Sequence, residues 1–206
     1  MSGPAEVLGV EVSKPDKELF PATDGAKAVT KLDLASYYAE VAPLMLPHLR
    51  GRPINMQRLP DGIEGPSFYE KKVPGHFPDY VHTVEVQTAA GPQRQVVVGD
   101  ARSLAYLAQQ ACITPHTWLS TEHDLDRPDL LVFDLDPSVP GLAAVRRATR
   151  LVGDLLDDLG LTSYLKTTGS RGYHVVVPLR RNGDFDEVRR SPGASPRCWW
   201  TGSPTC

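Results

Sequence analysis

The sequence predicts an α+β fold or a mixed α/β sheet, because strand-like runs and a helical pattern alternate along its second half. Residues 130–135 are an apolar run too short for a helix, and residues 141–159 place apolar side chains at helical spacing. Two further strand-like runs, residues 163–166 and 173–177, follow and are joined by a glycine-containing turn. This order of strand, helix, strand, turn and strand carries the prediction of fold class.

The first half is expected to hold less regular structure. Residues 1–30 are polar and predict loops, and a helical pattern then begins at Asp33, the expected N-cap, with Pro43 and Pro47 limiting its length. Residues 51–78 are rich in proline and glycine and predict short extended pieces.

A hairpin and a second helix complete this half. Residues 81–86 and 94–98 alternate or run apolar around a central Gly-Pro pair, which predicts two antiparallel strands. Asp100 is the expected cap of the short amphipathic helix that follows.

Composition bounds the class of protein. A chain of 206 residues with 41% hydrophobic content is long enough for one globular domain, or a domain with an extension. Its net charge of −3 gives no general argument for nucleic acid, so such binding has to come from local patches. Three cysteines without a framework spacing favour reduced thiols, and neither a signal peptide nor a membrane-spanning run is present, so we expect a cytoplasmic protein without a membrane partner.

The most informative stretch ends in two acidic residues. Asp134 and Asp136 close the apolar run and are one residue apart, so on a strand their side chains point to the same face. Adjacent carboxylates repel each other unless a positive charge lies between them, and a divalent metal usually supplies it. The alternative is a plain strand end whose aspartates begin a turn that Pro137 closes.

The glycine turn is a second candidate site. Small residues from Thr168 to Gly172 let backbone amides approach an anion, and Lys166 and Arg171 add positive charge. His174 begins the next strand beside this turn. A turn without function is equally common, but beside a carboxylate pair it predicts a place for metal-bound phosphates.

Two weaker candidates lie earlier in the chain. His116, near a tryptophan, is more often a packed loop residue than a ligand. Arginines and lysines from Arg52 to Lys71 interleave with aromatic residues, which suits phosphate contacts and base stacking. A solvated loop with packed aromatic residues is the alternative there.

Taken together these pieces resemble one family, the polymerase domain of bacterial DNA ligase D, within the archaeo-eukaryotic primase superfamily. The resemblance rests on the following motifs, in order: Arg52-Pro53, Arg58-x-Pro60-x-Gly62, Phe68-x-x-Lys71, His116-x-Trp118, Arg127-Pro128-Asp129, Phe133-Asp134-Leu135-Asp136-Pro137 and Thr168-Gly169-x-x-Gly172-x-His174-Val175. The segment from Val12 to Pro21, with Thr30-Lys31 downstream, is similar to the family's N-terminal signature. The resemblance implies an α+β fold with primase-polymerase-like mixed or antiparallel sheets and flanking helices.

The resemblance also implies a function: template-dependent addition of nucleotides at DNA ends or gaps during non-homologous end joining, with Mn²⁺ or Mg²⁺. The implied partners are DNA with a 5′-phosphate, nucleoside triphosphates, and end-joining ligase and Ku-type proteins, and binding would associate the protein with the nucleoid. The implied site residues are these: Asp134 and Asp136 for metal and catalysis, with His116; Arg52, Lys166, Thr168, Gly169, Arg171, Gly172 and His174 for the nucleotide; and Lys17, Lys31, Arg58, Phe68, Tyr69 and Lys71 for DNA.

The sequence departs from the family in two places. Ser13 stands where many relatives carry asparagine in the N-terminal signature, a substitution that bears on 5′-phosphate recognition. The resemblance stops near residue 190, before the strands that supply the family's third metal-binding aspartate. We therefore expect an N-terminal tail over 1–11, a partial polymerase-like domain over 12–190, incomplete at its C-terminus, and an irregular, possibly out-of-frame tail over 191–206.

Loss of a metal ligand predicts impaired activity for this shortened form. A catalytically silent DNA-end-binding module is therefore one alternative function. The other is a haloacid-dehalogenase-type phosphatase, whose nucleophile motif is similar to Phe133-Asp134-Leu135-Asp136. That motif usually lies near the N-terminus and is followed by Gly-Thr, whereas Pro137-Ser138 follows here.

Overall fold

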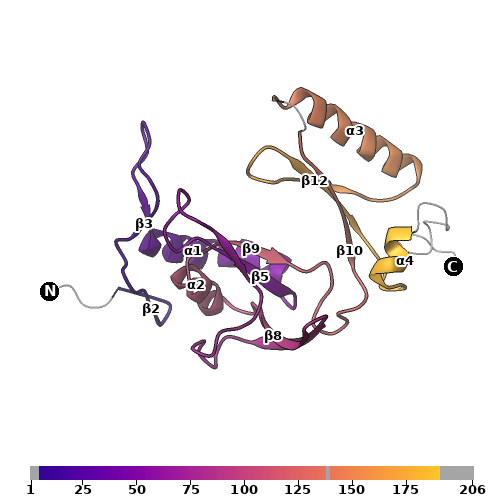
Figure 1. The fold of residues 1–206 in the computed structure, drawn as a ribbon. Helices are drawn as coiled ribbons and strands as arrows, with labels where there is room; N and C mark the ends of the chain where they lie inside the picture. Colours follow the sequence, from indigo (N-terminus) through magenta and orange to yellow (C-terminus); the bar gives the residue numbers. More distant parts are fainter. Residues whose placement is uncertain (1–4, 138–139, 191–206) are drawn as a thin grey trace. The chain divides into compact units, whose positions relative to one another are not determined.

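A computed structural model describes residues 5–137 and 140–190 of the chain (Figure 1). The expected tail over 191–206 and the first four residues of the expected N-terminal tail lie outside the described residues. The chain divides into two compact units, Met1–Trp118 and Leu119–Cys206, each with its own sheet. The two units are called unit 1 and unit 2 below. No helix among the described residues has both the length and the apolar run needed to cross a membrane.

Unit 1 begins with short strands where loops were predicted. Strands β1 (Glu6–Val7) and β2 (Val10–Glu11) pair with each other, and β3 (Glu18–Phe20) pairs with β4 (Val29–Thr30). Both pairs are too short to give a period-two pattern, which is why the sequence did not reveal them. The buried side chains of Val10 and Leu19 tie them to the core of unit 1.

The first helix, α1 (Lys31–Leu49), starts earlier and runs longer than predicted. Its N-cap is Thr30, and Asp33 is the third helical residue, completing a capping box with Thr30. Pro43 and Pro47 lie inside the helix instead of ending it. They are four residues apart and exposed, so the carbonyls that they leave without an N–H partner lie on the side facing water.

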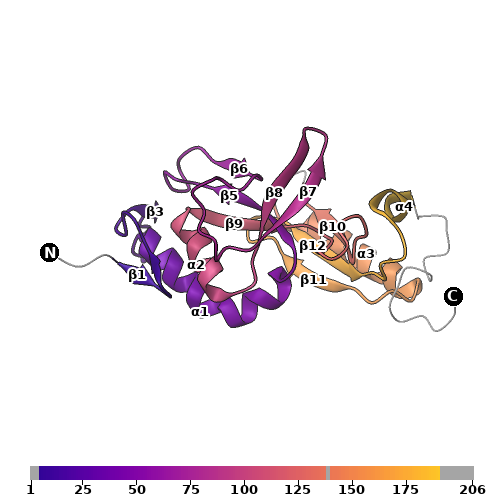
Figure 2. The ribbon, with the colours of Figure 1, turned by 90° about the horizontal axis from the view of Figure 1, so that it is seen from below.

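A five-stranded antiparallel sheet forms the rest of unit 1 together with α2 (Ala101–Gln109), which Asp100 caps as predicted (Figures 1 and 2). Strand β5 (Pro53–Arg58) pairs with β9 (Cys112–Thr117) on one edge. On its other edge, the start of β5 pairs with β8 (Gly91–Val97) and its end pairs with β6 (Phe68–Glu70). The predicted hairpin is confirmed as β7 (Thr83–Thr88) with β8. His116 lies on β9, a strand, where a loop was expected.

The core of unit 1 lies between the helices and this sheet. Leu34, Tyr38 and Leu46 of α1 are buried against Leu104 and Leu107 of α2. The Tyr38 hydroxyl donates to the Ile113 carbonyl at 2.7 Å, with the Cys112 carbonyl at 3.1 Å. Burial raises the pKa of Tyr38 far above its ordinary value, so this hydroxyl stays protonated and anchors α1 to β9.

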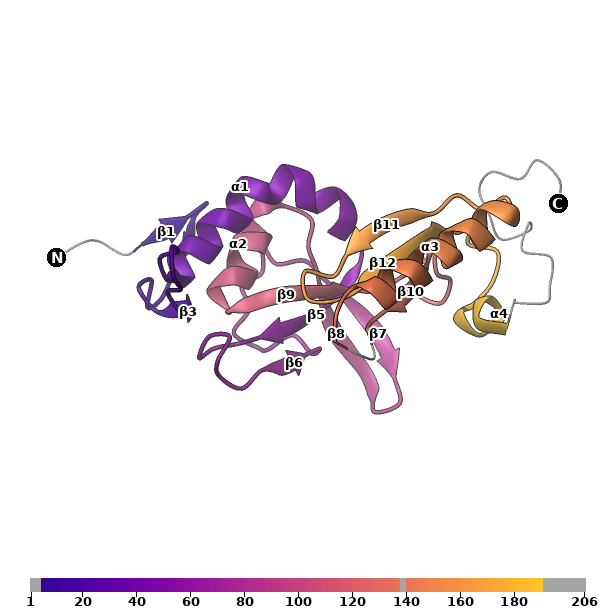
Figure 3. The same cartoon turned by 90° about the horizontal axis from the view of Figure 1, so that it is seen from above.

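Unit 2 is a three-stranded antiparallel sheet with one long helix against it (Figure 3). The strands are β10 (Leu130–Leu135), β12 (Tyr173–Pro178) and β11 (Tyr164–Thr167), in the spatial order β10-β12-β11. Helix α3 (Ala143–Asp158) connects β10 to β11, and the short α4 (Phe185–Arg190) ends the described chain. All four predicted elements from residue 130 to residue 177 are therefore confirmed.

The capping box of α1 supplies a first testable prediction. Thr30→Ala removes the hydroxyl that bonds the Asp33 amide at 3.2 Å and its carboxylate at 2.8 Å, and should lower the free energy of unfolding. We expect a loss of about 1 kcal/mol, measured by urea denaturation at neutral pH. Ser36→Ala, at an exposed position inside the same helix, is the matched control and should not destabilise the chain.

The same variant has a predictable pH dependence. The hydrogen bonds from the Thr30 backbone and side chain hold the pKa of Asp33 below its ordinary value. The stabilisation is therefore present above the ordinary carboxyl pKa and is lost as the pH falls through the lowered one. The difference between wild type and Thr30→Ala should shrink in acid, and a difference that grows in acid would contradict the capping box.

Candidate functional site

The three strands of unit 2 bring the predicted charged residues onto one face. Asp134 is paired with His174 on the neighbouring strand, and His174 with Lys166 on the next. Directly paired residues of antiparallel strands point to the same side, so these three side chains form one row. Asp136, two residues beyond Asp134, points to this face too. We call these four residues the charged face of unit 2.

The opposite face of the same sheet is apolar. Val175 and Val177 of β12 are buried there with Leu156 of α3, and Phe133 and Leu135 pack against them. The alternation of strand side chains thus assigns packing to one face and leaves the other open. Removal of a charge from the charged face should therefore leave the contact with α3 intact.

The carboxylates of the charged face are available to a ligand. The Asp134 side chain is 64% exposed, and its Oδ1 lies 3.3 Å from Nε2 of His174, whose side chain is 28% exposed. Asp136 is exposed as well. His174 contacts the first carboxylate of the pair, and a bound cation would offset the repulsion between the two.

The donor set of this pair fits a hard divalent cation. Carboxylate oxygens are the ligands that Mg²⁺ and Mn²⁺ prefer, and Mg²⁺ commonly binds one or two carboxylates together with water and substrate phosphates. Among the described residues no group of three or more His, Cys, Asp or Glu side chains is placed to hold a metal ion. The remaining positions around a cation at Asp134 and Asp136 would therefore fall to water and to oxygens of a bound anion.

The turn from Thr168 to Gly172 is closed by its own hydrogen bonds. The Thr168 hydroxyl accepts from the amides of Gly172 at 3.1 Å and Ser170 at 3.3 Å, and the Thr168 amide donates to the Gly172 carbonyl at 3.1 Å. Gly169 has a φ of +80°, the left-handed region that glycine adopts without strain. Thr168 thus holds the shape of the turn, while Arg171 is exposed.

Gly172 meets the carboxylate strand so closely that only glycine fits. A Cβ at this position would overlap Oδ1 of Asp136 and would lie 2.6 Å from the carbonyl oxygen of Leu135. The glycine of the predicted phosphate turn and the second aspartate of the metal pair are therefore neighbours. The sequence predicted both residues, but not this contact between them.

In unit 1 a cluster of lysines surrounds Ser13. Lys31, at the first position of α1, is 7% exposed, and its Nζ donates to the Ser13 hydroxyl at 3.1 Å. Lys17 forms an ion pair with the exposed Asp61, with 2.7 Å between Nζ and Oδ1. Lys14 is exposed, with a φ of +49° that turns the chain at this point. Ser13, Lys14, Lys17 and Lys31 are called the lysine cluster.

The electrostatics of the lysine cluster favour an anion. Burial, followed by the positive charges of Lys17, Lys14 and Arg58, lowers the pKa of Lys31. The hydrogen bond and charge of Lys17 hold the pKa of Asp61 below its ordinary value. An anion bound beside Lys31 would relieve the repulsion among these cations and restore the basicity of Lys31.

Arg58 is held by the fold on several sides. Its guanidinium bonds Glu70 Oε2 at 2.5 Å and both the carbonyl and the side-chain oxygen of Gln110, and it lies 5.5 Å from the centre of the Phe68 ring. Its side chain is 17% exposed. Arg58 therefore fixes β6 against the end of α2, and its predicted contact with DNA stays a prediction.

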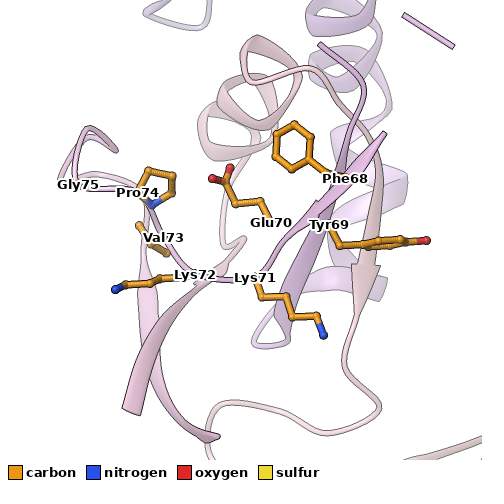
Figure 4. Close-up of a pocket in the computed structure, with 8 residues that line it drawn as sticks. All are labelled: Phe68, Tyr69, Glu70, Lys71, Lys72, Val73, Pro74 and Gly75. Atoms are coloured by element: carbon orange, nitrogen blue, oxygen red, sulfur yellow. The ribbon is translucent and has the colours of Figure 1, made fainter. Parts of the chain in front are cut away.

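Strand β6 carries two exposed aromatic side chains. Figure 4 shows Phe68 and Glu70 on one side of this strand and Tyr69 on the other, with Lys71 following. Residues 68–75 line an open cavity of about 430 Å³. The Tyr69 ring lies 5.3 Å from that of His116, and His116 Nε2 lies 3.3 Å from Gln57 Oε1, so Tyr69 and His116 are neighbours in unit 1.

The predicted residues are thus divided between the two units. The charged face and its turn belong to unit 2, whereas the lysine cluster, the β6 aromatic residues, His116 and Arg52 belong to unit 1. Arg52 Nη1 lies 3.4 Å from the Trp118 carbonyl. The sequence did not reveal Gln109, which bonds Ser13 across 96 positions, or Gln57 beside His116. No local pattern could have indicated either contact.

A paired-carboxylate strand beside a glycine turn, together with a separate lysine cluster, is an arrangement suited to ligands that carry phosphate groups. Comparison with known proteins identifies the family. The model of the family "LigD, primase-polymerase domain" matches residues 30–194. The chain therefore belongs to the LigD primase-polymerase domain family, as its motifs predicted.

The relatives and the solved structure agree with this assignment. The chain is 38% identical to the multifunctional non-homologous end joining protein LigD of Pseudomonas aeruginosa over 90% of its length, and 37% identical to the corresponding DNA repair protein of Mycobacterium tuberculosis (strain ATCC 25618 / H37Rv) over 94%. It spans 22% and 25% of those relatives. It is similar to the polymerase domain of Mycobacterium tuberculosis ligase D in complex with DNA, with a TM-score of 0.74 and 36% identity, covering 82% of this chain and 61% of that one. The α+β fold is thereby confirmed.

The close approach of Gly172 supplies a second prediction. Gly172→Ala should displace Asp136 or the end of β10, because the added methyl group overlaps a carboxylate oxygen and crowds a backbone carbonyl. We expect a loss of about 1–3 kcal/mol in the free energy of unfolding, measured by urea denaturation.

Gly153→Ala is the matched control for this variant. Gly153 lies in α3, and a Cβ there would meet nothing within 4 Å. The same chemical change should therefore leave stability unchanged or raise it by about 0.4–1 kcal/mol. Equal effects at the two glycines would contradict the packing of Gly172 on Asp136.

Proposed function

We propose that this chain is a DNA-end-binding, template-dependent nucleotidyltransferase of the DNA/RNA polymerase or primase type that fills gaps in non-homologous end joining. The observation that carries the proposal is the charged face of unit 2, where Asp134 and Asp136 are exposed beside His174 and Lys166 while the other face packs on α3. Family membership supports it. The family match includes the Asp-x-Asp strand, so it gives the phosphatase alternative no support.

Asp134 and Asp136 are proposed to hold the divalent cation, Mn²⁺ or Mg²⁺. When bound, the cation would neutralise triphosphate charge and make the primer hydroxyl more acidic, which is how metal ions assist phosphoryl transfer. Asp134 in β10 and Asp136 just beyond its end contribute negative charge and oxygen ligands. His174, bonded to Asp134, fixes the orientation of that carboxylate.

The triphosphate is proposed to lie over the turn of unit 2. Gly169 and Gly172 leave the turn free of bulky side chains, and exposed Lys166 and Arg171 supply positive charge. Thr168 shapes the turn through its hydroxyl. Arg52 is proposed to take part in nucleotide binding and His116 in catalysis, as the family motifs imply.

The DNA is proposed to bind unit 1. Phe68 and Tyr69 are exposed aromatic side chains suited to stacking on template bases, with Lys71 near the backbone. The lysine cluster is proposed to bind the 5′-phosphate of the downstream strand through Lys17 and Lys31. End-joining ligase and Ku-type proteins are the proposed partners, with a cytoplasmic location associated with the nucleoid on DNA.

Nucleotide incorporation tests the proposal. With Mn²⁺ and a labelled nucleotide, the wild-type chain should extend the primer of a gapped duplex that carries a 5′-phosphate at a low but measurable rate. Asp134→Asn should lower the rate by about a hundredfold or more, because it removes a charged cation ligand. Asp154→Asn, an exposed aspartate of α3 outside the charged face, is the matched control and should keep the wild-type rate.

Two results would count against this proposal. Extension that survives Asp134→Asn would show that the carboxylate pair does not do the chemistry. Binding that requires a 5′-phosphate, without incorporation by the wild-type chain, would instead establish the catalytically silent end-binding module.

The phosphate site has its own test. Lys31→Met removes a cation that is 7% exposed inside the lysine cluster while keeping an apolar stem of similar length. It should lower affinity for a 5′-phosphorylated gap by about tenfold and leave affinity for the 5′-hydroxyl duplex unchanged, as fluorescence anisotropy can measure. Lys27→Met, at an exposed position, makes the same change of charge and should affect both duplexes equally and weakly.

A further inference from the structure

Ser13 is held by a residue that is distant in sequence. Gln109, the last residue of α2, accepts a hydrogen bond from the Ser13 backbone amide through Oε1 at 2.9 Å. Its Nε2 donates to the Ser13 hydroxyl oxygen, also at 2.9 Å. Because the backbone amide can only donate, the orientation of the Gln109 side-chain amide follows from these contacts: oxygen toward the backbone, nitrogen toward the hydroxyl.

After these contacts, the Ser13 hydroxyl can still donate one hydrogen bond. Its oxygen accepts from Gln109 Nε2 and from Lys31 Nζ, the latter at 3.1 Å, so both acceptor positions of a hydroxyl are filled. Neither the Gln109 nitrogen nor a lysine ammonium can accept a hydrogen bond. The hydroxyl hydrogen therefore has to be donated elsewhere, and Ser13 is exposed.

The surroundings identify what would receive this hydrogen. Lys31 shares the hydroxyl, and Lys14 and Lys17 contribute two of the charges that lower the pKa of Lys31. Asp61 forms an ion pair with Lys17. A group that only accepts hydrogen bonds and carries negative charge fits best, and a terminal phosphate offers three such oxygens.

We propose that Gln109 is a positioning residue of the phosphate site: it fixes the Ser13 hydroxyl as a donor to a terminal phosphate oxygen of a DNA end, beside Lys31. The proposal rests on the proposed 5′-phosphate recognition and adds a specificity device to it. Gln109 acts through Ser13, because both ends of its amide are used by that residue.

A double-mutant cycle tests this role. Gln109→Glu keeps the size of the side chain and an oxygen for the Ser13 amide, but it lacks the N–H donor and would draw the Ser13 hydrogen onto itself. The readout is the ratio of affinities for a gapped duplex with a 5′-phosphate and one with a 5′-hydroxyl, measured by fluorescence anisotropy. Ser13→Ala and the double variant complete the cycle.

We expect Gln109→Glu to reduce the preference for 5′-phosphate by about tenfold in wild type and clearly less in the Ser13→Ala background. The effect that remains there reports only the added negative charge. Gln87→Glu, at an exposed position on β7, is the control for that charge and should leave the ratio near wild type. Ser13→Thr, which keeps the hydroxyl, should retain the preference.

The outcomes separate the two proposals. A wild-type chain without preference for 5′-phosphate would overturn the proposed end recognition itself. A clear wild-type preference that Gln109→Glu lowers equally in both backgrounds would leave end recognition standing and overturn the role of Gln109. If Gln109→Glu does not fold, as judged by circular dichroism, Ser13→Ala alone decides, because a preference retained in that variant overturns the proposal.

Discussion

The repulsion between two carboxylates on one face of one strand is the constraint on which unit 2 depends. Asp134 and Asp136 cannot turn away from each other without moving apolar neighbours out of the packing against α3, because strand side chains alternate. His174 contacts Asp134, and Gly172 lets the turn after β11 pass directly beside Asp136. The sheet therefore maintains a negatively charged, exposed site that a divalent cation with bound phosphates would stabilise. A fold selected for stability alone would gain nothing from this arrangement.

Unit 1 gathers positive charge in its lysine cluster, whereas unit 2 gathers negative charge at its carboxylate pair. Lys31 is 7% exposed, and other cations add to the burial that lowers its pKa, so the cluster favours an incoming anion. Polar contacts from α2 reach this cluster through Gln109, while Arg58 uses its donors to fix β6 and its aromatic residues. Each unit thus holds a charged group on a well-packed support, and the proposed reaction needs both: a cation site for the triphosphate and an anion site for the DNA end. A net charge of −3 is therefore compatible with separate local sites for a cation and for an anion.

The sequence predicted the local structure of unit 2 well, because its strands and helix follow clear periodicities. The Asp-x-Asp strand, the glycine turn and His174 could be identified as one candidate site from type and order alone. The length of helix α1 could not be predicted, because the cost of Pro43 and Pro47 depends on whether their side of the helix faces water. His116 was expected in a loop because Pro115 masks the strand pattern of β9. The contacts of Gln109 with Ser13 and of Gly172 with Asp136 depend on tertiary folding, which a single sequence without homologues does not reveal.

The central claim is that the Asp134–Asp136 pair holds a divalent cation together with a triphosphate. Electron paramagnetic resonance of Mn²⁺, titrated with the chain and a non-hydrolysable nucleoside triphosphate, measures this binding without requiring turnover. The wild-type chain should remove free Mn²⁺ from solution in the presence of the nucleotide beyond what the nucleotide binds alone, and Asp136→Asn should abolish that excess. Excess binding that is unchanged in Asp136→Asn would place the cation elsewhere and contradict the account.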